Sequence, residues 1–453
     1  MRLAVLVLLL AALAAPGRAL ACKTLAVTKD PSPFKHYVTI QKAVDAAKPC
    51  DWILVAPGIY RESVTIRKRN IHLRGLNRNQ VVVDGGHAKG VNGIEVVKAS
   101  NVWIENLTVR NFDRTDRDGE GGNQIWWNGG DESGKIGASG WYGRYLTAYD
   151  DGLLGGYGLF VSNSVKGTWD HVYASGFNDA GLYVGACPDC RGVIAHALSE
   201  NNALGYSGTN SGGHLIVQDS VFRSNGVGVV PNSLPQDPPP PQLGTCDSAS
   251  NTTPTPTIAS TAVARCTIFR RNRIVSNGNL ATPTNSTTGQ IPWGIGLLLL
   301  GAYGDLVANN VITGNPNFGL LAMENPVPFP PTPKTLYFQV SGNKVVNNTI
   351  SGGKYADVAL EGGLFGSKQS VNNCFAGNRI GKSLPADLTP WACSLQTTPN
   401  SDSVTTGALF GTILQLSTES QSRRSQPQPP PPPQPTMPNP CSGPPGRSPL
   451  CHG

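Results

Sequence analysis

The sequence predicts an all-β protein built as a solenoid of stacked coils, and three observations carry this prediction. Only 14% of the 453 residues are charged, against about a quarter in ordinary soluble domains. Glycine and proline are abundant, with 53 and 37 residues, which favours strands and turns over surface helices. The third observation is an internal repeat with a period of about 24 residues, which is typical of solenoids.

Seven segments carry the repeat and align without gaps. Their central residues are Leu107, Val172, Ala197, Val221, Arg273, Val311 and Thr349. Two spacings are free of insertions, the one from Val172 to Ala197 and the one from Ala197 to Val221, whereas the other gaps are longer.

The columns of this alignment distinguish a parallel β-helix from a leucine-rich repeat, which would need leucine at several fixed positions. The residue directly before the central one is often asparagine, and the residue directly after it is mostly bulky and apolar. A second asparagine-rich position lies four residues after the central one, at the next turn, where asparagine tolerates left-handed backbone. Side chains alternate across a strand, so the positions directly before and directly after the central residue, which are two residues apart, both point inward. In the column before the central residue, the amides would bond to one another along the axis. This column would contain Asn106, His171, His196, Ser220, Asn272, Asn310 and Asn348, which makes the two histidines ladder residues rather than a catalytic pair.

Residues 1–21 read as a signal peptide. Arg2 precedes an apolar run from Leu3 to Ala15, and Ala19-Leu20-Ala21 supplies small residues before Cys22. We therefore expect a secreted protein, in the cell wall or at the cell surface. Lipidation of Cys22 is the alternative, although it would leave nine cysteines, an odd number in an oxidising compartment. No later apolar run is long enough to span a membrane.

Residues from about Thr39 to Ile380 resemble the pectin-lyase-like right-handed parallel β-helix family. The segments that carry the resemblance are TIQKAVDAA, DWILVAPGIYRESVTI, NIHLRGLN and VVVDGG, which begin at Thr39, Asp51, Asn70 and Val81. It implies a right-handed parallel β-helix that handles extracellular polysaccharide. The first segment reads as an amphipathic helix with one apolar face, which would cap the open end of the solenoid. That face contains Ile40, Ala43, Val44 and Ala47.

The solenoid is expected to occupy residues 22–383, with two insertions. The first, at about 113–158, is rich in glycine and aromatic residues, and the second, at 231–264, is rich in proline, serine and threonine. Residues 384–424 would form an irregular segment. The proline-rich residues 425–453 would form an extended tail, a linker or wall spacer.

Ten cysteines are present, and a solenoid makes mostly near-neighbour contacts. We therefore expect neighbouring cysteines to pair: Cys22 with Cys50, Cys187 with Cys190, Cys246 with Cys266, Cys374 with Cys393, and Cys441 with Cys451.

Four aspartates are candidate catalytic residues: Asp150, Asp151, Asp170 and Asp219. In the alignment, Asp170 and Asp219 lie two coils apart. Two coils measure roughly 10 Å, near the upper limit of the carboxylate spacing in inverting glycosidases, about 6.5–9.5 Å. A lyase would instead need a base together with carboxylates that bind calcium or neutralise a uronate. Three of the aspartates beside Arg144 could supply these groups.

The predicted insertion from Asp113 is rich in aromatic residues that could stack on sugar rings. The candidate substrate-binding residues are Trp126, Trp127, Trp141, Tyr142 and Tyr145, with Arg144 and Arg223 as cationic contacts. The alternative is that the aromatic side chains pack this segment onto the coils.

No single enzyme family is matched by its motifs. YDDGLL and GTWD loosely resemble the two aspartate segments of pectin methylesterases, but the other segments of that family are absent, and polygalacturonases and mannuronan epimerases are matched no better. Two hypotheses remain: a lyase or glycoside hydrolase of acidic glycans, and a non-catalytic glycan-binding or structural surface protein. The net charge of +7 is spread without a basic block, which argues against nucleic-acid binding and permits an acidic glycan. We expect a monomer.

Overall fold

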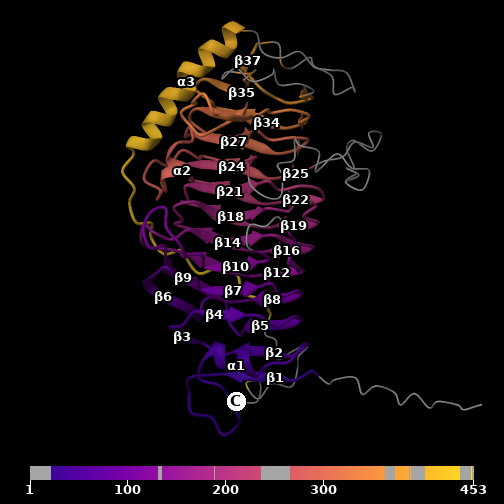
Figure 1. Cartoon of the computed structure of the whole chain (residues 1–453), viewed down its shortest axis with the longest axis vertical. Coiled ribbons are helices and arrows are strands. Elements are labelled where there is room, and N and C mark those ends of the chain that lie inside the picture. Colours follow the sequence, from indigo (N-terminus) through magenta and orange to yellow (C-terminus); the bar gives the residue numbers. More distant parts are fainter. Residues whose placement is uncertain are drawn as a thin grey trace, which may run out of the picture.

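The computed structural model describes residues 22–130, 135–187, 189–235, 266–361, 363, 373–386, 388, 403–438 and 450. Within these residues, three long parallel sheets are stacked as in a parallel β-helix (Figure 1). We name them sheets A, B and C, and each coil passes through them in that order.

Sheet A contains β1 (Thr24–Val27), β2 (Trp52–Val55), β5 (Ile71–Gly75), β8 (Val102–Glu105), β12 (Trp141–Arg144), β16 (Gly167–Asp170), β19 (Gly192–Ala195), β22 (Leu215–Gln218), β25 (Thr267–Arg270), β28 (Leu306–Ala308), β33 (Lys344–Val346) and β36 (Cys374–Ala376). Sheet B contains β3 (Gly58–Tyr60), β6 (Val81–Lys89), β9 (Thr108–Asp113), β13 (Thr147–Tyr149), β17 (Tyr173–Ser175), β20 (Leu198–Glu200), β23 (Val221–Arg223), β26 (Arg273–Val275), β29 (Val311–Thr313) and β34 (Thr349–Ser351).

Sheet C contains β4 (Val64–Ile66), β7 (Ile94–Val97), β10 (Ile125–Asn128), β14 (Tyr157–Ser162), β18 (Ala180–Gly185), β21 (Leu204–Thr209), β24 (Val227–Asn232), β27 (Ile295–Leu300), β30 (Phe318–Met323), β35 (Ala356–Leu360) and β37 (Ser383–Leu384). Two small pairs lie outside the long sheets, β11 (Ala138–Ser139) with β15 (Ser164–Val165), and β31 (Asn325–Val327) with β32 (Leu336–Phe338).

The register of sheet B corrects the sequence alignment by one residue. Val221 pairs with Leu198, not with Ala197 as the gap-free alignment requires. The buried amide ladder between sheets A and B therefore contains Asn272, Asn310, Asn348 and Asn378, joined by side-chain hydrogen bonds of 3.1, 2.9 and 2.9 Å. The corresponding residues of earlier coils are apolar, Val172 and Ala197.

His171 and His196 do not belong to this ladder, so that prediction is wrong. They lie one residue earlier, in a column of left-handed residues at the corner between sheets A and B. In this column φ ranges from 50° to 57°, and its members are Asn106, Tyr145, His171, His196, Asp219, Arg271, Asn309 and Asn347. The side chains of His171 and His196 are 38% and 54% exposed.

A second buried ladder lies at the corner between sheets B and C. Asn202, Asn225, Asn277 and Asn315 are joined by hydrogen bonds of 3.1, 3.0 and 3.0 Å between neighbouring side chains. Together the two ladders pair buried side-chain amides that would otherwise be unsatisfied inside the solenoid.

The stretch predicted as a first insertion is part of the solenoid. It contributes β10 to sheet C, β12 to sheet A and β13 to sheet B. The repeat alignment does not include this coil, because Tyr145, and not an asparagine or histidine, precedes its buried Leu146. The predicted second insertion lies mostly outside the described residues.

The helix predicted near the N-terminus is present as α1 (Ile40–Ala46), with Ile40, Ala43 and Val44 buried. It contacts β1, β2 and β4, the first strands of sheets A and C. The Thr39 side chain accepts a hydrogen bond from the Lys42 amide and so caps the N-terminus of the helix.

The segment predicted as irregular contains a long helix, α3 (Ser403–Ser422). Leu409, Ile413 and Leu416 are buried in a cluster with outward-facing residues of β27 and β30, so the helix covers the outer face of sheet C near its C-terminal end (Figure 1). Among the described residues, no helix has the length and apolar content needed to cross a membrane.

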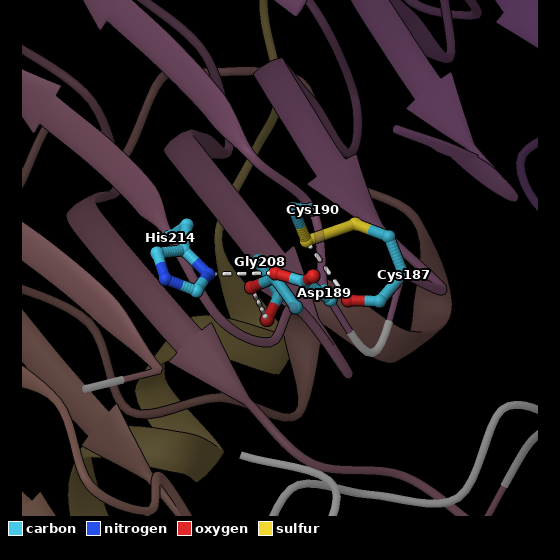
Figure 2. Close-up of a disulfide and its surroundings, with 6 residues drawn as sticks. Cys187, Asp189, Cys190, Gly208 and His214 are labelled. Carbon is cyan, nitrogen blue, oxygen red and sulfur yellow. Dashed lines mark hydrogen bonds and ion pairs between the residues drawn. A yellow bond between two sulfur atoms is a disulfide. The ribbon is translucent and has the colours of Figure 1, made fainter. Parts of the chain in front are cut away.

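Two predicted disulfides are formed, Cys22–Cys50 and Cys187–Cys190. Figure 2 shows the second bridge closing a tight turn while Asp189, inside that turn, points toward His214 at 2.8 Å. Cys266 and Cys374 are also disulfide-bonded. The partners predicted for them, Cys246 and Cys393, and the predicted pair Cys441–Cys451 lie outside the described residues.

Candidate functional site

A row of aromatic side chains crosses the outer face of sheet C. Trp126, Phe160 and Tyr183 occupy the same register position in β10, β14 and β18. The Trp126 and Phe160 rings stack with centroids 4.9 Å apart, and Tyr183 meets Phe160 edge-on at 4.8 Å. Tyr157, at the start of β14, lies 4.6 Å from the Phe160 ring. These half-buried rings form a continuous apolar surface along the solenoid axis.

The row leads into a cavity of about 470 Å³. Tyr157 and Tyr183 form part of its wall, together with outward-facing residues of the next sheet C strands. The opposite wall comes from α2 (Ser286–Gly289) and the residues after it, from Asn325–Phe329, and from Ile413 and Ser417 of α3. The candidate site is therefore the aromatic row on sheet C together with the cavity beside α3, and we call this combination the groove.

The Asp179 side chain lines the cavity and is held by two buried polar side chains, Arg114 and Asn285. The Arg114 guanidinium lies 3.2 Å from the Asp179 carboxylate and 5.2 Å from the centroid of the Tyr157 ring. Asn285, the residue that caps α2, donates a hydrogen bond of 2.9 Å to the same Asp179 oxygen. The carboxylate is thus fixed in place by two donors from different elements.

Burial and the charge of Asp179 shift the pKa values of the side chains at this end of the site. It raises the pKa of Tyr183 to about 12 and, with the nearby Asp179 charge, holds the pKa of Tyr157 well above its usual value of 10.0. Burial lowers the pKa of Arg114, but Asp179 and Tyr157 outweigh this effect, and the pKa is raised overall. At neutral pH both phenols therefore remain hydrogen-bond donors and Arg114 remains charged.

A second polar cluster lies beside the groove, at the corner between sheets B and C. It contains His87, Asp113, Asp150 and Asp151, with the His87 ring nitrogens 3.3 Å from Asp113 and 3.1 Å from Asp151. Asp113 directly precedes Arg114 in the sequence, so one residue contributes to the cluster and the next to the groove. Two of the four candidate catalytic aspartates are in this cluster.

The other two candidate aspartates, Asp170 and Asp219, lie at the corner between sheets A and B. Asp170 contacts the Nδ1 atoms of His171 and His196 at 3.0 and 2.8 Å. Asp219 forms an ion pair with Arg271 at 2.7 Å. They occupy neighbouring columns rather than one, because Asp170 ends β16 whereas Asp219 follows β22 in the left-handed column. The four aspartates therefore belong to two separate clusters and do not converge.

The predicted substrate-binding residues are similarly divided. Trp127 and Trp141 are 2% and 1% exposed, so their predicted role is wrong and they fill the core. Tyr142 ends a stacked row on sheet A formed by Trp52, His72, Trp103 and Tyr142.

The remaining predicted contacts also lie away from the groove. Arg144 lies over the Trp103 ring at 4.8 Å, and Tyr145 stacks on His171 at the A–B corner. Arg223 contacts Glu200 on sheet B at 2.5 Å. Of the predicted contacts, Trp126 alone lies in the row on sheet C.

Sequence reasoning missed Tyr157, Phe160, Tyr183, Asp179 and Arg114. A usable signal was present, since Trp126, Phe160 and Tyr183 follow an inward-outward alternation in three successive sheet C strands. The predicted insertion at residues 113–158 hides this signal, because it places Trp126 outside the coils.

No protein-family model matches the sequence, and no curated protein sequence matches it. Solved structures do match. The A-module of the Azotobacter vinelandii mannuronan C-5 epimerase AlgE6 is 17% identical, with a TM-score of 0.53 over 75% of this chain and 81% of that one. A mannuronic acid specific polysaccharide family 6 lyase from human gut microbiota is 16% identical, with a TM-score of 0.47 over 79% and 80% of the two chains.

The pectin methylesterase PemA from Erwinia chrysanthemi is 14% identical, with a TM-score of 0.39 over 73% of this chain and 90% of that one. At these identities the likeness concerns the fold, and the AlgE6 match carries it. The chain therefore has the fold of the pectin-lyase-like parallel β-helix proteins.

Proposed function

We propose that the chain binds an extracellular acidic polysaccharide along the outer face of sheet C, with the polymer parallel to the solenoid axis. The observation that carries this proposal is the aromatic row that leads into the cavity. Strands of neighbouring coils are about 4.8 Å apart, so successive sugar units of a linear polymer can contact successive coils. Aromatic faces supply apolar area for the rings, and the polar groups at the end of the groove fix orientation.

Two further observations support an acidic, extracellular ligand. The chain carries a net charge of +7, and Arg114 stays charged at the end of the groove. The disulfides fit an oxidising compartment. The AlgE6 module, which shares the fold, is named for action on mannuronan, an acidic polymer.

A second candidate function, β-elimination in the same groove, is favoured by the grouping of Arg114, Asp179 and Tyr157. Arg114 would neutralise a uronate carboxylate and so acidify the neighbouring C5 proton. Asp179 would accept this proton, and Tyr157, which its raised pKa keeps protonated, would protonate the leaving O4 as the C4–O4 bond breaks and a C4–C5 double bond forms. Hydrolysis by paired carboxylates has less support, because Asp179 is the only carboxylate among the described residues that line the cavity.

Binding is tested by affinity electrophoresis of the purified chain in gels containing polymannuronate, pectate or a neutral glucan. We expect retardation by an acidic polymer, and we expect Tyr183→Ala to weaken it at least 10-fold. Tyr142→Ala is the matched control, because Tyr142 ends an equivalent aromatic row on sheet A, and it should bind like the parent chain. Equal losses in both variants, or no retardation by either acidic polymer, would refute the proposal.

The elimination reaction is tested on the same polymers by ultraviolet absorbance of the unsaturated product. Asp179→Asn and Tyr157→Phe should each abolish product formation while retaining retardation in the gel. Binding without any product would identify the chain as a non-catalytic binder.

A further inference from the structure

We propose that His87, Asp113 and Asp150 bind a divalent transition-metal ion, with zinc as the probe, at the corner between sheets B and C. These residues come from three consecutive strands of sheet B or from the turn directly after them: β6, β9 and β13. One ligand atom from each lies within 4.8 Å of the others. His87 Nδ1 is 3.3 Å from Asp113 Oδ2 and 3.8 Å from Asp150 Oδ1.

A bulge in β6 places the histidine there. The register of β6 against β9 shifts between Asp84 and Ala88, and Gly86 and His87 adopt left-handed φ values of 56° and 63°. A side chain at Gly85 would collide with the Asn111 carbonyl oxygen at 2.2 Å. The glycines thus permit a close approach between coils. His87 leaves the regular pairing of β6 with β9 and lies level with Asp113 and Asp150.

Asp150 provides the independent observation that a ligand is needed. Its side chain is fully buried, and Oδ2 accepts a hydrogen bond of 3.0 Å from the Gly155 amide. Oδ1, the atom nearest His87, has no hydrogen-bond partner among the described residues. A buried carboxylate oxygen without a partner is costly, and a cation bound between Asp113, Asp150 and His87 would satisfy it.

The charges of the cluster point the same way. The Asp113 and Asp150 side chains each offer a carboxylate oxygen within 4.8 Å of the other, and two carboxylates this close repel each other. A divalent cation would replace that repulsion with attraction to both.

Asp151 completes the arrangement as a positioning residue. Its Oδ1 lies 3.1 Å from His87 Nε2. A carboxylate that accepts the proton of one imidazole nitrogen leaves the other nitrogen free as a ligand, which is how metal-binding histidines are commonly oriented. Here the free nitrogen is Nδ1, the one that faces Asp113 and Asp150.

The donor set favours a transition metal over calcium. Calcium prefers six to eight oxygen ligands, whereas one imidazole and two carboxylates suit zinc and similar ions. The His87 side chain is 43% exposed, which leaves the site open to solvent. It also lies next to the groove, because the Arg114 amide donates a hydrogen bond of 2.8 Å to Leu154 in the turn that follows Asp150 and Asp151.

The test is isothermal titration of the untagged full chain with zinc after removal of metals with a chelator. We expect a site that takes one zinc ion per chain and is lost in both His87→Ala and Asp150→Asn. Asp151→Asn should bind zinc about 10- to 100-fold more weakly. His196→Ala is the matched control, because Asp170, His171 and His196 form a similar but exposed group, and it should keep the site.

Circular dichroism of each variant establishes that it is folded, and His87→Gln serves if His87→Ala is not. Unchanged zinc affinity in the His87 variants, or loss of the site in His196→Ala, would overturn the assignment. Tighter binding of calcium than of zinc would overturn the choice of metal. No glycan is present in the titration, so this result is separate from the success or failure of the proposed polysaccharide binding.

Discussion

Thr436 donates a hydrogen bond of 2.8 Å from its hydroxyl to the Asn106 side-chain oxygen, across 330 residues of sequence. The Met437 amide donates to the same oxygen, also at 2.8 Å. Earlier in the tail, the Gln426 amide donates to the Ala281 carbonyl at 2.8 Å. The proline-rich segment therefore leaves α3 and runs back along the solenoid toward its N-terminal coils.

The exposure of the tail has a period of three. Between residues 425 and 438 the less exposed positions are Ser425, Gln428, Pro431, Gln434 and Met437. A polyproline II helix has three residues per turn, so one side of it faces the coils. Gln428 at Ala281 and Thr436 at Asn106 are 436 − 428 = 8 residues apart, or about 25 Å at a rise of about 3.1 Å per residue.

The number of coils between Ala281 and Asn106 gives nearly the same distance. Five strand spacings separate β26, which precedes Ala281, from β9, which follows Asn106, and at about 4.8 Å each they span about 24 Å. Residues 425–438 therefore lie against the solenoid. The role of the tail as a linker or wall spacer stays a prediction.

Truncation after Arg424 should expose the surface that the tail covers. The Arg78 amide donates to Thr436 Oγ1 at 3.1 Å, and its guanidinium donates to the Pro435 carbonyl at 3.1 Å. Without these partners, we expect the Arg78 amide to exchange hydrogen at least about 10-fold faster by mass spectrometry. Peptides around Ile312, in the core of later coils, should be unchanged. Identical exchange at Arg78 in both chains would show that the tail is not docked in solution.

Replacement of Asn310 by alanine should destabilise the solenoid strongly. Asn310 Oδ1 accepts hydrogen bonds from the Asn272 amide and side chain, at 2.9 and 3.1 Å, and its own side-chain amide donates to Asn348 at 2.9 Å. The substitution leaves several buried groups without partners, and each costs about 1–3 kcal/mol. We expect the free energy of unfolding in urea to fall by about 2–5 kcal/mol.

The neighbouring Asn309 provides the control. It is exposed and has a φ of 57°, so Asn309→Gly should change stability by less than about 0.5 kcal/mol. Similar losses in both variants would mean that the ladder is not the source of the effect.

The fold could be predicted from the sequence because the later coils repeat an amide at a fixed position. The one-residue error arose because asparagine suits two adjacent columns for different reasons. In the left-handed column it tolerates the backbone, and in the ladder its amide pairs with the next coil. The pair Asn309–Asn310 satisfies both, so the sequence does not say which residue points inward. At His196–Ala197 a histidine occupies the left-handed column and an alanine the ladder column. The gap-free alignment wrongly places this histidine in the ladder.

The site could be predicted only in part, because it depends on the corners of the coil. His87 and Asp150 are distant in the sequence, and a bulge and two turns of the solenoid bring them together. Neither the bulge nor the number of residues in each corner follows from a repeat pattern. The choice between Trp126 and Trp127 depends on strand phase, which the sequence does not define once the coil is mistaken for a loop.

Trp126 and Trp127 should therefore respond in opposite ways to the same substitution. Trp127 is 2% exposed in the core, so Trp127→Ala should lower the free energy of unfolding by about 3–5 kcal/mol. Trp126 lies on the outer face, where its indole donates to Ser162 at 3.0 Å. Trp126→Ala should weaken glycan binding and leave the thermal midpoint nearly unchanged. If Trp126→Ala unfolds the chain as readily as Trp127→Ala, then Trp126 is a core residue.

The stability of the metal-free chain should rise as the pH falls through neutrality, and Asp150 should account for much of this rise. In the folded chain its pKa is raised from 3.8 to about 7, chiefly by burial, so the folded state binds the proton more tightly than the unfolded state does. Stability from this group therefore increases from about pH 7 down to about pH 4. The pKa of His87 is also raised, because Asp113, Asp150 and Asp151 outweigh its burial. Its contribution is present at low pH and lost as the pH rises, in the same direction.

Calorimetric midpoints between about pH 5 and pH 8, measured in chelator, test this linkage. Asp150→Asn should flatten the profile, because the amide does not titrate. Asp219→Asn is the control, since hydrogen bonds from Arg271 lower the pKa of Asp219 below 3.8, and Asp219 therefore does not titrate in this range. A profile that stays equally steep in Asp150→Asn would assign the pH dependence to another group and remove the argument that Asp150 is held in an unfavourable charged state.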